Sequence, residues 1–133
     1  MHDKLTESIQ SAAYLQWEET GSGSPLEHWR CVEDIACFIE ERGLFNEDAL
    51  TNALNDGGTG YEEIIREIAY RLSFHSGEKT AEENWYLTER LLHKSEWRQM
   101  IIQTAEIYAQ KKHDPEFFDH IRSERVKERY RNG

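Results

Sequence analysis

Apolar residues recur every three or four positions along most of the chain, and strict alternation of apolar and polar residues is scarce. This spacing is typical of helices that bury one face. Four stripes of this kind can be read from the sequence: Ile9, Ala13, Trp17 and Thr20; Trp29, Val32, Ala36 and Ile39; Tyr61, Ile65, Ile68 and Leu72; Trp97, Ile101, Ala105 and Tyr108. The pattern predicts an all-α protein of about seven helices.

The helical pattern occurs twice, with a period of 56 residues. Seven identities join residues 9–35 to residues 65–91: Ile9 and Ile65, Ala13 and Ala69, Tyr14 and Tyr70, Gly21 and Gly77, Glu27 and Glu83, Trp29 and Trp85, Glu33 and Glu89. Because several of these are rare residue types, the coincidence favours a duplicated structural unit. In each copy a Gly ends the first helix, and Ser24-Pro25-Leu26-Glu27 or Thr80-Ala81-Glu82-Glu83 caps the second. Each copy is therefore predicted to be a helical hairpin.

A third helix is predicted after each hairpin, short in the first copy, where Asn46 caps it, and longer in the second. At 133 residues the chain has the usual length of one domain. We expect residues 1–133 to form a single compact bundle, with repeat 1 over 3–58, repeat 2 over 59–113 and a C-terminal capping helix over 114–131.

The formal charge of −10 is unevenly distributed, because residues 1–110 carry −12 and residues 111–133 carry +2. An acidic body of this size repels nucleic acid and anionic membranes and favours basic partners. No apolar run approaches the ~18 residues of a membrane span. Cys31 and Cys37 match no Cys-x-x-Cys signature, and no secretory signal precedes them. We expect a cytoplasmic protein that does not bind membranes.

The first copy contains Ala13-Tyr14, Trp17-Glu18, Gly21, Glu27-His28-Trp29 and Glu33, and the second contains Ile65-Arg66, Ala69-Tyr70, Gly77, Glu83-Asn84-Trp85 and Glu89. These residues resemble a short bacterial domain of unknown function with the pattern I-R-x-x-A-Y-x-x-W-E, a Gly-containing loop, then E-H-W-x-x-A-E. The second copy departs from it with Ser73-Phe74 in place of Trp-Glu. The resemblance implies a helical hairpin and a bacterial source, and it brings no activity.

The recurring aromatic and acidic residues are candidates for the repeat core: Tyr14, Trp29, Glu33, Tyr70, Trp85 and Glu89. Each Glu follows its Trp by four residues and so shares a helix face with it. The carboxylate could accept a hydrogen bond from the Trp or from the Tyr on the facing arm. We interpret the six as structural ties between the arms, and a polar binding pocket is the alternative.

Metal and catalytic sites have weaker support. Glu89 and His93, and likewise Glu116 and His120, are four apart, but the Glu-x-x-His spacing of di-iron bundles is missing. Surface histidines are the simpler interpretation. The loop Gly57-Gly58-Thr59-Gly60 lacks the Lys-Ser/Thr ending of a phosphate-binding loop. We therefore predict no catalytic residue, no metal and no cofactor.

Two aromatic residues, Tyr86 and Trp97, are predicted to be exposed anchors for a partner, and Arg122, Arg125 and Arg129 lie on the basic last helix. The leading hypothesis is a small acidic, non-enzymatic interaction or regulatory module that binds another protein, a basic surface being one option. The alternative is a ligand-binding or metal-binding protein, or an enzyme, that uses a cleft between the two halves. Nucleic-acid contact through the last helix comes third.

Overall fold

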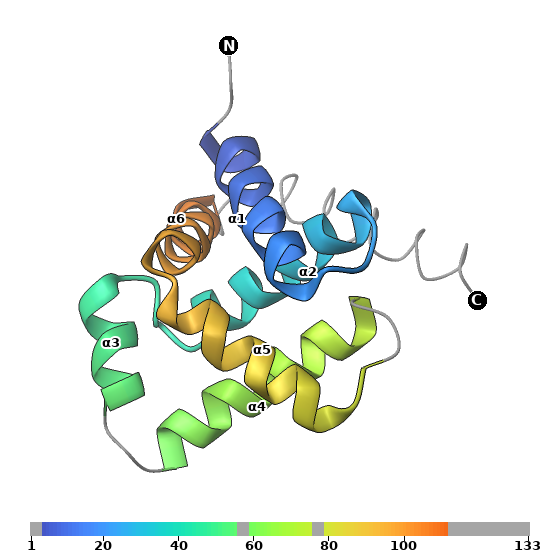
Figure 1. Cartoon of the computed structure of the whole chain (residues 1–133). Helices are drawn as coiled ribbons and strands as arrows, with labels where there is room; N and C mark the ends of the chain where they lie inside the picture. The colour runs from blue at the N-terminus through green and yellow to red at the C-terminus, as the bar shows by residue number, and fades with distance from the viewer. Residues whose placement is uncertain (1–3, 56–58, 76–78, 112–133) are drawn as a thin grey trace.

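The computed structural model describes residues 4–55, 59–75 and 79–111, which fold into six helices (Figure 1). They are α1 (Lys4–Thr20), α2 (Pro25–Glu41), α3 (Glu47–Asn55), α4 (Thr59–His75), α5 (Ala81–His93) and α6 (Ser95–Lys111). No strand occurs among these residues, so the predicted all-α class is confirmed. The predicted capping helix over 114–131 falls outside them. None of the described helices has the length and apolar character needed to cross a membrane.

Side-chain caps start the helices where the sequence predicts. Ser24 Oγ accepts a hydrogen bond from the backbone N–H of Glu27 at 3.1 Å, and Thr80 Oγ1 accepts one from Glu83 at the same distance. Asn46 Oδ1 accepts from the N–H of Ala49 at 2.7 Å and begins α3. These bonds satisfy N–H groups that have no partner within the helix.

The two hairpins, α1–α2 and α4–α5, meet where α2 packs against α4 (Figure 1). The third helices join them differently: α6 packs against both α1 and α2, whereas the shorter α3 packs against α4 and α6. The last helix of the second copy thus covers the hairpin of the first copy. One hydrophobic cluster contains residues of both copies, among them Ile35, Ile65 and Ile101.

Trp97 lies in this cluster with none of its surface exposed, so its prediction as a partner-binding residue is wrong. It is the first residue of the stripe formed by Trp97, Ile101, Ala105 and Tyr108, and all four side chains are buried. Because α6 packs against α1 and α2, this stripe faces the core, and Trp97 is buried as part of it.

The loop between α1 and α2 passes closely over a buried histidine. Gly21 and Gly23 both have positive φ, at 68° and 91°. A Cβ atom at Gly21 would meet nothing within 4 Å, but one at Gly23 would lie 2.8 Å from His28 Nε2. Gly23 is therefore required both by its backbone conformation and by the space that the imidazole takes.

We predict that Trp97→Ala lowers the free energy of unfolding by about 3–5 kcal/mol, because it removes a large buried ring and leaves a cavity. The matched change Tyr86→Ala removes a side chain that is 52% exposed and should shift stability by no more than about 0.5 kcal/mol. Urea unfolding followed by circular dichroism measures both. Equal losses in the two variants would contradict the placement of Trp97.

We also predict that Gly23→Ala destabilises the protein more than Gly21→Ala. Both changes impose left-handed backbone strain of about 1–2 kcal/mol. Only Gly23→Ala must in addition displace the His28 ring, which should add roughly 1–3 kcal/mol. Thermal or urea unfolding of the two variants checks the order, and a reversed order would show that the loop does not close over His28.

Candidate functional site

Tyr14 and Tyr70 point to solvent, each with 59% of its surface exposed, so their prediction as core residues is wrong. Each stands two positions from two buried residues of its own helix, namely Ala12 and Gln16 in α1 and Ile68 and Leu72 in α4. Two residues along a helix correspond to about 160° of separation, which places both tyrosines on the outer faces. The two tyrosines thus occupy equivalent outward positions, 56 residues apart.

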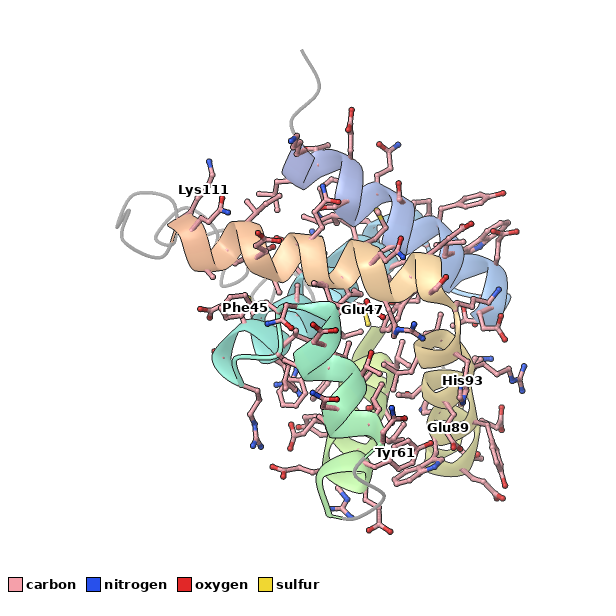
Figure 2. All side chains as sticks on the ribbon, turned by 90° about the vertical axis from the view of Figure 1, so that its left-hand side faces the viewer. Phe45, Glu47, Tyr61, Glu89, His93 and Lys111 are labelled. Carbon is pink, nitrogen blue, oxygen red and sulfur yellow. The ribbon has the colours of Figure 1, made fainter. Side chains whose placement is uncertain are left out.

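The other repeat-core candidates lie nearer the interior. Trp29 and Trp85 are half-buried and pack against the hydrophobic cluster, as their structural interpretation requires. Glu33 and Glu89 are also half-buried. Glu89 accepts a hydrogen bond at 2.6 Å from the hydroxyl of Tyr61, a different tyrosine of α4 from the predicted Tyr70. Figure 2 shows Tyr61 on α4 near Glu89 and His93 on α5.

A small polar pocket surrounds this hydrogen bond. Its volume is about 150 Å³, and eight residues of α3 to α6 line it: Thr51, Leu54, Asn55, Tyr61, Glu89, Leu92, His93 and Arg98. The bond to Glu89, burial and the negative charge of Glu89 together raise the pKa of Tyr61 from its ordinary value of 10.0 to about 12. Glu89 is thus engaged by a hydroxyl that stays protonated at neutral pH.

Metal ligation gains no support from the described residues, among which no group of three or more His, Cys, Asp or Glu side chains is placed to hold an ion. Glu116 and His120, the second predicted pair, lie outside the described residues. His93 is exposed, as expected of a surface histidine.

His28 contradicts the prediction of surface histidines, because none of its surface is exposed. Its Nε2 donates to the carbonyl of Ser22 at 2.6 Å, and its Nδ1 accepts from Gln16 Nε2 at 3.0 Å. A carbonyl can only accept, which assigns the proton to Nε2. This histidine joins α2 to α1 and to the loop between them. The sequence could have indicated the burial of His28, because it lies four residues before Val32, which belongs to the apolar stripe of α2.

Neither cysteine forms a disulfide, and Cys31 lacks the environment of a nucleophile. Cys31 is completely buried, and burial raises the pKa of its thiol far above the ordinary value. Cys37 is half-buried and packs against the core. Both are structural residues in α2.

A broad surface depression lies along α1, and we name it the α1 groove. Its volume is about 930 Å³. The residues that line it come mainly from α1, with contributions from the first turns of α2 and α6: Glu7, Gln10, Ser11, Ala13, Tyr14, Leu15, Trp17, Glu18, Pro25, Trp29 and Glu96. Tyr14 and Trp17 contribute large exposed surfaces, 59% and 45%, and Trp29 is half-buried. The groove thus combines three aromatic side chains with three carboxylates.

Most residues of the α1 groove are not predicted by the sequence to form a site. Trp17 was predicted to lie on the buried stripe of α1, but it lies beside that stripe, where Gln16 and Thr20 take the inner positions. The spacing of Glu7, Tyr14 and Glu18, seven and four residues apart, could have indicated a shared outer face. Of the predicted partner-binding residues, Tyr86 is exposed on α5. Arg122, Arg125 and Arg129 lie outside the described residues.

Comparison of the chain with protein-family models, with curated proteins and with solved structures gives no match. The resemblance to a bacterial domain of unknown function therefore stays a prediction.

We predict that the Tyr61–Glu89 bond makes stability sensitive to alkaline pH. The pKa of Tyr61 is raised in the folded protein to about 12 from 10.0, so its contribution is fully present below pH 10 and is lost as the pH rises through 12. The free energy of unfolding should fall more steeply over this range in the wild type than in Tyr61→Phe. Urea unfolding at several pH values measures it. The control Tyr86→Phe, at an exposed site, should follow the wild type, and parallel curves for all three proteins would contradict the prediction.

Proposed function

We propose that this protein is a small acidic, non-enzymatic module that binds another protein through the α1 groove. The observation that carries the proposal is the exposure of Tyr14 and Trp17 beside Trp29 in a depression of about 930 Å³. Tyr and Trp are the residues that most often anchor protein interfaces, because they offer large rigid surfaces at a small cost in conformational entropy.

The composition of the groove supports a protein partner over a small substrate. It is open and extends along α1 to the starts of α2 and α6, and Gln10 and Ser11 add hydrogen-bonding groups to its aromatic residues. An apolar centre with a polar border is the usual anatomy of a protein interface. Small-molecule sites, in contrast, enclose most of the ligand surface.

The polar pocket around Tyr61 and Glu89 supports a second candidate function, the binding of a small ligand. Its volume of about 150 Å³ suits a molecule of only a few atoms. The groups around it include a carboxylate, an imidazole and the guanidinium of Arg98. Arg98, however, is held by Glu47 at 3.0 Å and by the carbonyl of Leu92 at 2.6 Å. Because Tyr61, Glu89 and Arg98 already have hydrogen-bond partners within the protein, this pocket ranks below the α1 groove. The third candidate, nucleic-acid contact through Arg122, Arg125 and Arg129, stays a prediction.

Affinity capture with the full chain tests the proposal. Wild type, Tyr14→Ala and Trp17→Ala are immobilised, and the proteins that each retains from a lysate of the source cell are quantified by mass spectrometry. We expect a specific protein whose recovery falls at least about tenfold in both variants, as loss of an interface anchor of about 2 kcal/mol would cause.

Tyr70→Ala is the matched control, because Tyr70 occupies the equivalent position of the second copy and has the same exposed fraction of 59%. It should retain the partner as the wild type does. Equal losses for Tyr14→Ala and Tyr70→Ala, or equal recovery by all variants, would contradict docking at the α1 groove.

A further inference from the structure

The outer faces of the two hairpins differ in charge although they share a tyrosine. On α1, Glu7, Tyr14 and Glu18 follow at spacings of seven and four, so they share one face. The equivalent positions of α4, 56 residues later, hold Glu63, Tyr70 and Phe74. The second copy has thus a phenyl ring where the first has the carboxylate of Glu18.

The carboxylates of the α1 groove also differ from other carboxylates of the protein in their ion pairing. Within the described residues, Glu7, Glu18 and Glu96 make no ion pair. The counterpart of Glu7 in the second copy, Glu63, pairs with Arg42, and Glu19 pairs with Arg90 and Lys94 at 3.3 Å. The groove therefore presents three exposed negative charges that no described cation neutralises.

The aromatic rings are arranged differently as well. The ring centroids of Tyr14 and Trp17 are 6.2 Å apart, with 36° between the planes. A single ammonium or guanidinium group can therefore lie within about 6 Å of both centroids, the range of a cation–π interaction. Tyr70 and Phe74 instead pack edge to face, with their ring centroids 4.9 Å apart.

The charge of the whole first unit acts in the same direction. Residues 4–55 contain ten acidic and three basic side chains. Such a surplus attracts positive ligands over distances comparable to the Debye length of about 8 Å at physiological salt. The three carboxylates of the α1 groove and the overall negative potential of this unit thus both favour a positively charged partner.

We propose that the α1 groove binds a Lys- and Arg-rich segment of a partner protein. A cationic head group lies over Tyr14 and Trp17, the carboxylates of Glu7, Glu18 and Glu96 surround it, and the aliphatic part of the side chain packs against Trp29. Arginine suits the site best, since its planar guanidinium stacks on aromatic rings and binds carboxylates with two hydrogen bonds. This assignment rests on the proposed function and adds the chemistry of the partner.

Isothermal titration calorimetry of the full chain with synthetic peptides tests it. One peptide alternates arginine with leucine, and two matched peptides carry glutamine or glutamate in place of arginine. We expect the arginine peptide to bind at least about tenfold more tightly than the glutamine peptide, the glutamate peptide to show no binding, and affinity to fall as salt rises.

Variants locate the binding. Glu18→Gln should weaken binding of the arginine peptide about two- to fivefold. Tyr14→Ala, and the combination of Glu7→Gln, Glu18→Gln and Glu96→Gln, should each weaken it by more than about tenfold. The controls Glu62→Gln and Tyr70→Ala alter an exposed carboxylate and tyrosine of α4 and should leave affinity within about twofold. Unchanged unfolding midpoints exclude misfolding as the cause.

The proposal is overturned if arginine and glutamine peptides bind alike, or if the groove and α4 variants weaken binding equally. Analytical ultracentrifugation tests whether a second copy of the chain occupies the groove instead. Self-association that Trp17→Ala abolishes would also overturn the proposal. Failure here is distinct from failure of the proposed function. A captured partner that depends on Tyr14 and Trp17, together with indifference to peptide charge, would leave protein docking in place and remove only the cationic partner.

Discussion

The burial of α2 is the constraint on which the rest of the structure depends. Cys31, Val32, Ile35 and Ala36 have no exposed surface, and together they span an arc of about 140° around the helix. A single hairpin partner cannot cover such a helix. It is enclosed by α1 from its own copy and by α4 and α6 from the other copy. The apolar residues of the two copies are therefore buried in one shared hydrophobic cluster.

The enclosure of α2 also determines which surfaces remain available for binding. The helix α1 packs inward with Ile9, Ala12 and Gln16, so Tyr14 and Glu18 are left on its outer face. The helix α4 does the same with Ile68 and Leu72, and it leaves Tyr70 outside. The two hairpins thus present two comparable outer faces. Within the described residues, the carboxylates of Glu7 and Glu18 on the α1 face make no ion pair, whereas at the equivalent positions of α4 Glu63 pairs with Arg42 and Phe74 replaces Glu18. This difference between the copies is the basis of the proposed cationic specificity.

Much of the local structure was predictable from the sequence. The hydroxyls of Ser24 and Thr80 cap their helices as the Ser/Thr-x-x-Glu pattern predicts, because capping depends on residues only three positions apart. The stripe from Trp97 to Tyr108 is buried as its spacing predicts. The candidate site was less predictable. Periodicity places Trp17 near the inner residues of α1, but whether its side chain is covered depends on how the neighbouring helices pack. The packing of α4 against α5 likewise places Tyr61, and not Tyr70, within hydrogen-bond distance of Glu89.

By itself the sequence determined the helical class, the 56-residue repeat, the helix starts and the acidic character of the protein, because each depends on neighbours along the chain or on composition. Only the tertiary structure decided that His28 and Trp97 are buried, that Tyr14 is exposed, and that Glu96 of α6 lies at the same groove as Glu7 of α1. These outcomes depend on contacts between residues far apart in the chain. A side chain with a given helical spacing can be core or surface, and the packing of the other helices determines which it is.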